Sequence, residues 1–141
     1  MVVPGAAYVI DASVAIKWAV AEHGTEQALR LRGHALCAPD LLVAECANIL
    51  WRKVRLGERA PREASLAARL LERVDIDLIP MCRLLDRALA LAIARDHPAC
   101  DAVYLVLAET TGRVFVTADA RLLRKLVGTA IPTVLLADFS G

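Results

Sequence analysis

Short stretches of β-branched and other apolar residues alternate along the chain with longer stretches of helical spacing. The strand-like stretches lie at residues 8–10, 35–38, 77–80, 114–116 and 133–136. The helical stretches lie at residues 12–21, 24–31, 41–56, 61–74, 83–95, 98–110 and 120–127. Such alternation is typical of a parallel sheet that is covered by helices on both faces. The sequence therefore predicts an α/β fold, a three-layer α/β/α sandwich with a short parallel sheet of about five strands, in one domain over residues 1–141.

Composition narrows the class of protein further. Apolar residues make up 57% of the 141 residues, and 17 basic residues stand against 16 acidic ones. This balance excludes intrinsic disorder, and the near-zero total charge argues at first against a nucleic-acid binder. The longest uninterrupted apolar run covers residues 102–108, far short of the ~20 residues of a membrane span. Because the sequence also shows no signal-peptide pattern, we expect a cytoplasmic protein without a membrane segment.

The four cysteines show no pattern of a metal or disulfide site. They lie at positions 37, 46, 82 and 100, without a C-x-x-C pair and without histidines at zinc-ligand spacing. We therefore expect four reduced and buried thiols.

Two acidic residues stand where a predicted strand passes into a predicted helix. Asp11 follows the first strand and Asp119 follows the fourth. Each would also suit a helix N-cap, whose side chain accepts a hydrogen bond from a backbone N–H group. Functional sites of parallel α/β folds gather at these carboxyl ends of strands, near a change in strand order. Taken alone, each aspartate fits a cap or a site.

Two further acidic residues lie in apolar helical segments. Glu45 has leucines and isoleucine around it at helical spacing, and Asp101 stands in the first turn of its helix, where the helix dipole favours a carboxylate. Glu45 lies in mid-helix, so it has no capping role and needs a cation. If the four carboxylates meet, their repulsion requires a bound cation or proton uptake. Such oxygen ligands favour Mg²⁺ or Mn²⁺ over zinc, which predicts metal-dependent hydrolysis of phosphodiester bonds.

Four acidic segments occur in order between residues 9 and 122. They are VIDASV at 9–14, PDLLVAECANIL at 39–50, HPACDAVYL at 97–105 and VTADARL at 116–122. In these segments the chain resembles PIN-domain ribonucleases, most closely the VapC-type toxins of type II toxin–antitoxin pairs. The resemblance implies a compact α/β/α fold and a metal-dependent endoribonuclease activity, with Mg²⁺ or Mn²⁺ as the cofactor.

The resemblance also assigns roles to the acidic residues. Asp11, Glu45 and Asp101 match the three principal acidic positions of the family, and Asp119 matches the fourth, less strictly kept one. By analogy, Asp11 and Asp101 ligate the principal metal directly. Glu45 and Asp119 act directly or through water, and Glu45 orients the attacking water.

Other positions match supporting residues of the family. Ser13 and Thr117 match hydroxyl positions that line or support the site, and Asn48 matches an asparagine that often accompanies the helix acid. Cys100 stands where the family often has tyrosine, which puts the pocket wall in doubt but not metal binding. The family further implies a homodimer and a small VapB-like antitoxin whose C-terminal segment covers the active-site groove.

Basic residues gather directly after the Glu45 helix, so the near-neutral total hides a local excess. Between residues 49 and 73 seven basic residues stand against three acidic ones, and Arg52, Lys53 and Arg55 are our candidates for contacts with the RNA backbone. The alternative is a solvated helical hairpin with pairs of opposite charge. Trp18 suits the core or a partner interface better than base stacking.

Three other functions compete with a ribonuclease toxin. A PIN nuclease of RNA processing would have the same active site. A non-catalytic protein-binding domain would use the acids as helix caps and an apolar surface for its partner. A phosphatase with an aspartyl nucleophile is disfavoured, since it would need a D-x-D motif where this chain has Asp11-Ala12-Ser13.

Overall fold

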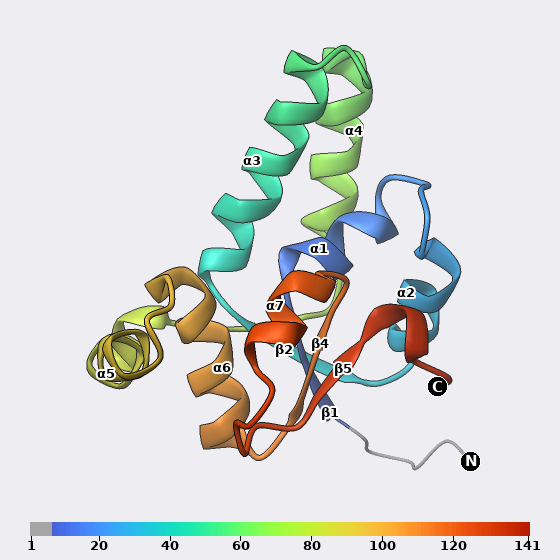
Figure 1. The fold of residues 1–141 in the computed structure, drawn as a ribbon. Coiled ribbons are helices and arrows are strands. Elements are labelled where there is room, and N and C mark those ends of the chain that lie inside the picture. Colours follow the sequence, from blue (N-terminus) through green and yellow to red (C-terminus); the bar gives the residue numbers. More distant parts are fainter. Residues whose placement is uncertain (1–6) are drawn as a thin grey trace.

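The computed structural model describes residues 7–141, and a sheet of five parallel strands lies at its centre (Figure 1). The strands are β1 (Ala7–Ile10), β2 (Ala35–Pro39), β3 (Asp77–Ile79), β4 (Val114–Thr117) and β5 (Thr133–Leu135). Their order across the sheet is β3-β2-β1-β4-β5. In the central strand, Val9 pairs with Cys37 of β2 on one side and Phe115 of β4 on the other. Both Val9 and Phe115 are fully buried.

Helices connect the strands and form the outer layers. They are α1 (Ala12–Ala15), α2 (Thr25–Leu31), α3 (Leu41–Arg55), α4 (Pro61–Leu71), α5 (Leu85–Arg95), α6 (Ala99–Thr111) and α7 (Ala120–Lys125), with short 3-10 turns η1 (Ile16–Trp18), η2 (Met81–Leu84) and η3 (Leu136–Asp138). In Figure 1, α5 and α6 lie on one side of the sheet and α2 on the other. The predicted α/β class with a five-stranded parallel sheet is therefore confirmed.

Helix α6 shows why the sequence forms these layers. Its residues 102–108 are all apolar and all buried, because the helix packs across β1, β2 and β4. Gly112 ends the helix in the left-handed conformation, with φ 66°, which glycine adopts without the steric penalty of a side chain. The buried helix in turn carries Asp101 in its first turn.

The expected helix over residues 12–21 is wrong in its length. The α-helix ends at Ala15 and continues only as the 3-10 turn η1. Trp18 packs against the core, and its indole N–H donates a hydrogen bond of 2.7 Å to the Ala28 carbonyl of α2. This tertiary contact bends the chain toward α2, and it gives Trp18 the core position expected for it.

Helices α3 and α4 form a hairpin that extends past the carboxyl ends of the strands (Figure 1). A small apolar cluster of Ile16, Val20, Leu50 and Ala67 holds the hairpin to the segment after α1. Ala67 is the buried residue of α4. The first turns of α3 belong to the main core through Leu42 and Cys46, so the smaller cluster holds only α4 and the second half of α3.

The cysteines divide into two classes. Cys37 and Cys46 are buried, as expected, but Cys82 in η2 and Cys100 in the first turn of α6 are exposed. The expectation of four buried thiols is wrong for this second pair, since both lie near the start of a surface helical segment. Across residues 7–141, we find no helix that combines the length and the apolar character of a membrane span.

Candidate active site

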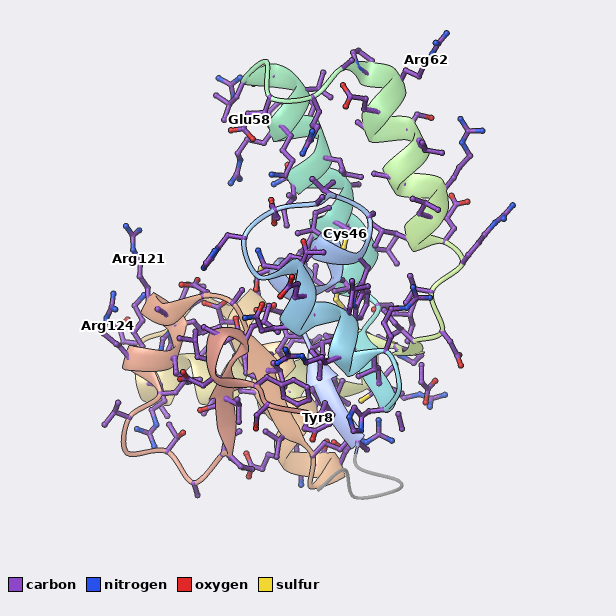
Figure 2. All side chains as sticks on the ribbon, turned by 90° about the vertical axis from the view of Figure 1, so that its right-hand side faces the viewer. Tyr8, Cys46, Glu58, Arg62, Arg121 and Arg124 are labelled. Atoms are coloured by element: carbon purple, nitrogen blue, oxygen red, sulfur yellow. The ribbon has the colours of Figure 1, made fainter. Side chains whose placement is uncertain are left out.

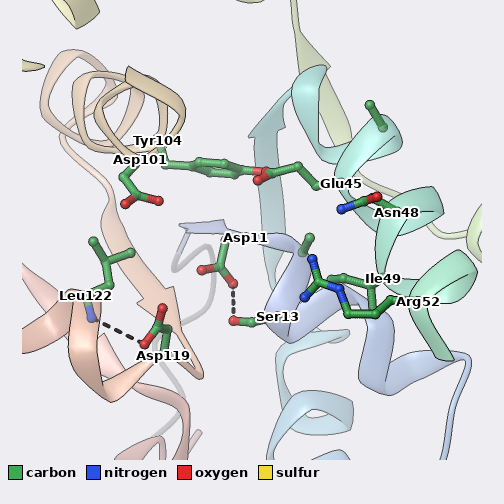
Figure 3. Close-up of a pocket in the computed structure, with 12 residues that line it drawn as sticks. Asp11, Ser13, Glu45, Asn48, Ile49, Arg52, Asp101, Tyr104, Asp119 and Leu122 are labelled. Carbon is green, nitrogen blue, oxygen red and sulfur yellow. Dashed lines mark hydrogen bonds between the residues drawn. The ribbon is translucent and has the colours of Figure 1, made fainter. Parts of the chain in front are cut away.

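The four acidic residues singled out in the sequence line one cavity of about 340 Å³ (Figure 3). Asp11 follows β1 and Asp119 follows β4, the two neighbouring strands from which the chain leaves toward opposite ends of the strand order. Glu45 comes from α3 and Asp101 from α6. Four elements that are distant in sequence thus bring their carboxylates to the carboxyl end of the sheet, where folds of this type place their sites.

Asp11 is the most enclosed of these carboxylates. It caps α1 by accepting a hydrogen bond of 3.3 Å from the Val14 N–H, and it accepts two more from the hydroxyls of Ser13 (2.5 Å) and Thr117 (2.6 Å). Burial raises the pKa of Asp11 to about 6, and the negative charge of Glu45 adds to this rise. The three hydrogen bonds oppose the rise without cancelling it.

The two predicted hydroxyl residues join the ends of β1 and β4. Ser13 accepts a hydrogen bond of 3.0 Å from the Ala118 N–H, and Thr117, fully buried, accepts one of 3.1 Å from the Asp119 N–H. Each hydroxyl therefore bonds at once to the Asp11 carboxylate and to the backbone after β4. Through this network the positions of Asp11 and Asp119 depend on each other.

Asp119 caps α7 and lines the cavity as well. Its Oδ1 atom accepts hydrogen bonds from the N–H groups of Arg121 (2.9 Å) and Leu122 (3.3 Å). Asp11 combines the same two roles at α1. Each aspartate therefore caps a helix and lines the cavity at once, so the capping role does not exclude a role in a site.

Glu45 has a partner that the sequence analysis missed. The phenol of Tyr104 donates a hydrogen bond of 2.5 Å to Oε1 of Glu45 (Figure 3). Tyr104 is only 3% exposed and follows Asp101 by three positions, so both project from the same face of α6. The spacing of three positions after Asp101 was the sequence signal that could have placed Tyr104 in the cavity. Asn48, one turn after Glu45 on α3, lines the same cavity as expected.

Two further carboxyls of the cavity are also destabilised in their charged forms. Burial raises the pKa of Glu45, while the Tyr104 phenol lowers it and the Asp101 charge raises it. Burial likewise raises the pKa of Asp101, with an added contribution from Asp119, whereas the charges of His97 and Lys125 lower it. Asp11, Glu45 and Asp101 thus have raised pKa values in one cavity, because they are buried and lie near other acids.

The donor set fits a hard divalent cation by its chemistry. All four candidate ligands are carboxylates, which Mg²⁺ and Mn²⁺ prefer, and a cation among them would reverse the rise in their pKa values. Among the residues described, however, no three acidic, histidine or cysteine side chains stand close enough together to form a ready-made metal site. In this arrangement Ser13 and Thr117 hold Asp11, and Tyr104 holds Glu45, by hydrogen bonds.

The three basic candidates for RNA contact differ in position. Arg52 lines the cavity beside Asn48 (Figure 3). Lys53 instead lies between Glu22, at 3.0 Å, and Glu58, at 3.6 Å. The guanidinium of Arg55 lies 5.3 Å from the ring centre of Trp51, where the cation meets the aromatic face. Only the first of the three shares the cavity with the acids.

Comparisons with known proteins agree with this geometry. The PIN domain family matches residues 8–127. Ribonuclease VapC3 of Pyrobaculum aerophilum is 33% identical over 131 residues, covering 88% of this chain and 98% of the relative. Exonuclease VapC9 of the same organism is 33% identical over 122 residues, covering 86% of both. The crystal structure of PAE2754 from Pyrobaculum aerophilum superposes with a TM-score of 0.69 at 27% identity, covering 94% of this chain and 92% of that one. The chain therefore belongs to the PIN domain family, in its VapC type.

Proposed function

We propose that this protein is a ribonuclease that hydrolyses RNA phosphodiester bonds internally with the help of Mg²⁺ or Mn²⁺, as the toxin of a toxin–antitoxin pair in the cytoplasm. The observation that carries the proposal is the convergence of Asp11, Glu45, Asp101 and Asp119 on one cavity at the carboxyl end of the sheet. The raised pKa values of three of these groups support a site that works with a bound cation. The PIN family and two VapC relatives with nuclease names supply the substrate class.

In this proposal Asp11 and Asp101 hold the principal ion, and Glu45 and Asp119 complete its environment directly or through water. When bound, the ion neutralises charge on the phosphodiester and activates water for in-line attack. Asp11 is suited to its role because Ser13, Thr117 and the helix cap fix its orientation before any ligand arrives.

Glu45 is suited to orient the attacking water. The Tyr104 phenol holds its Oε1 atom, which leaves the carboxylate in a defined position and Oε2 able to accept a hydrogen bond from water. Arg52, on the same face of α3, would bind a phosphate oxygen of the substrate and offset its charge. No covalent nucleophile is needed for this reaction.

A circular single-stranded RNA tests the cleavage mode and the site together. Because a circle has no ends, an endonuclease linearises it in Mg²⁺ or Mn²⁺, whereas an exonuclease, the activity in the name of one relative, leaves it intact. EDTA should abolish cleavage, and Asp11→Asn and Asp101→Asn should each reduce it at least a hundredfold. The matched control is Asp77→Asn, since Asp77 is exposed at the amino end of β3.

Four outcomes would contradict the proposal in whole or in part. Cleavage in the presence of EDTA would show that the reaction needs no metal ion. Full activity in both Asp→Asn variants would show that these aspartates are not part of the active site. Degradation of linear RNA alone would replace the endonuclease with an exonuclease. A protein that neither cleaves nor binds RNA would instead be the non-catalytic binding domain.

The proposed partners are a second copy of the chain and a VapB-like antitoxin. Both follow from the family, and exposed apolar side chains are available for such contacts. Helix α5, for example, exposes Leu85, Leu89 and Ile93 at helical spacing, by 52% or more each. Light scattering on the purified protein should give the mass of a dimer, and a mass of 15.2 kDa would contradict it.

A further inference from the structure

Three basic residues gather on α7, the helix that begins at the pocket aspartate Asp119. They are Arg121, Arg124 and Lys125, and all three are exposed. Arg121 and Lys125 stand four positions apart and Arg121 and Arg124 three apart, so their side chains are neighbours on the helix surface. Figure 2 shows Arg121 and Arg124 extending outward from this helix. None of them formed part of the basic stretch predicted from the sequence.

None of these three basic residues forms an ion pair with an acidic residue within residues 7–141. The pairs found there involve Lys17, Lys53 and Arg59 instead. Like charges three and four positions apart repel each other and destabilise a helix. Arg124 and Lys125 at least lie in the last turn, where the helix dipole favours cations. Arg121 lies in the first turn, where the dipole disfavours a cation, so helix stability does not explain its charge.

The cluster borders the acidic cavity. Leu122, next to Arg121 and three positions before Lys125, lines the cavity together with Asp119. Asp119 begins α7 and Leu122 lies in its first turn, so this helix forms one wall of the cavity. Arg52 of α3 lines the opposite side of the cavity (Figure 3). Cations therefore stand on both sides of the carboxylates.

We propose that α7 carries the second half of the RNA-binding surface: Arg121 and Lys125 bind backbone phosphates on one side of the scissile bond, and Arg52 binds those on the other. The inference rests on the proposed ribonuclease function and assigns the path of the substrate. The strand crosses the cavity from α3 to α7 and does not follow the α3–α4 hairpin. Because these interactions are with phosphates, they position any single strand without reading its bases.

The test compares two arginines in equivalent places on different helices. Arg62 is exposed in the first turn of α4, as Arg121 is in that of α7, but it lies at the far end of the hairpin (Figure 2). We would measure binding of a fluorescent single-stranded RNA by anisotropy at several salt concentrations, in an Asp101→Asn background that prevents cleavage. Kinetics of the same substitutions in the active protein give KM and kcat separately.

Arg121→Gln should weaken RNA binding about fivefold, and Arg121→Gln with Lys125→Gln about twentyfold or more. The slope of log Kd against log salt should become shallower by about 0.7 for each phosphate that the variant no longer binds. In the active protein KM should rise with kcat unchanged, and Arg62→Gln should change none of these values. Equal effects at Arg62 and Arg121, or none at either, would overturn the path over α7.

The outcomes also separate this inference from the proposed function. If the wild type cleaves RNA but the α7 variants bind it normally, only the path is wrong. If the wild type binds RNA through α7 but does not cleave it in the presence of any divalent ion, the proposed ribonuclease function is wrong and the proposed binding surface is supported. If neither binding nor cleavage of RNA is seen, both fail.

Discussion

Replacing Asp11 by asparagine should stabilise the metal-free protein while it removes the activity. Burial raises the pKa of this carboxyl from 3.8 to about 6, so at neutral pH the folded protein holds a charge that it solvates poorly. A rise of that size corresponds to about 3 kcal/mol of folding free energy lost at neutral pH, at about 1.4 kcal/mol per pH unit. Asparagine is neutral and is as good an N-cap as aspartate.

Part of this gain is offset at the hydrogen bonds. In the wild type, the hydroxyls of Ser13 and Thr117 bond to the Asp11 carboxylate. Hydrogen bonds to a charged group are about twice as strong as those to a neutral amide, so the asparagine variant loses part of this energy. We therefore expect a net gain of about 1–2 kcal/mol at pH 7.5, which for a chain of this length is a rise in Tm of about 3–6 °C.

The pH dependence gives the sharper test. Since the folded-state pKa of Asp11 is raised, the folded protein binds a proton more tightly than the unfolded chain between about pH 4 and pH 6. The stability advantage of Asp11→Asn should therefore be absent below pH 4, grow through that range and level off above it. Urea unfolding in EDTA at each pH measures it. Asp77→Asn, at an exposed position, is the control. A difference from the wild type that is independent of pH, or that favours the wild type at pH 7.5, would refute the reasoning.

Three further predictions concern the groups around the carboxylates. Tyr104→Phe removes the hydrogen bond to Glu45, so kcat on the RNA substrate should fall about tenfold with little change in KM. An unchanged kcat would show that the phenol does not position Glu45. Thr117→Val leaves Asp11 without one of its donors and should lower the free energy of unfolding by about 2 kcal/mol, more than Thr111→Val, whose hydroxyl bonds only within its own helix; equal losses would contradict the role of Thr117. Mn²⁺ should raise the Tm of the wild type at pH 7.5 in differential scanning fluorimetry and should not raise that of Asp11→Asn, and equal shifts would place the ion elsewhere.

Local signals in the sequence were sufficient for the strands and for the four acids. Asp11 directly follows a run of β-branched residues and Asp119 follows another after one alanine, and the neighbours of Glu45 and Asp101 are apolar at helical spacing. The parallel sheet then brings strand ends together, so residues with no local relation share one cavity. Short-range patterns are enough for Asp11 and Asp119 because the strand-to-helix junctions of this sheet are where the cavity lies.

Side-chain interactions between segments distant in sequence could not be predicted from such local patterns. The bond between Tyr104 and Glu45 joins positions 59 apart, and that between Lys53 and Glu22 joins positions 31 apart. A buried tyrosine in an apolar helix is usually core, as Tyr104 is, but nothing local indicates that its phenol reaches Glu45. A lysine in a basic stretch is usually solvated, whereas Lys53 pairs with Glu22. The early end of α1 has the same origin, since the hydrogen bond that bends the chain at Trp18 is accepted by α2.

The thin anchoring of α4 and the second half of α3 has a consequence for how the molecule opens. Four residues, Ile16, Val20, Leu50 and Ala67, form the apolar cluster that holds these helical segments, while the sheet has a core several times larger. Segments with little buried apolar surface unfold locally at a lower free energy than the whole protein. Amide protons of α4 should therefore exchange with deuterium well before those of β1 and β4. The walls of the cavity at the strand ends, at α6 and at the first turns of α3 belong to the main core, so the far end of the hairpin can open without disturbing the hydrogen bonds that hold Asp11.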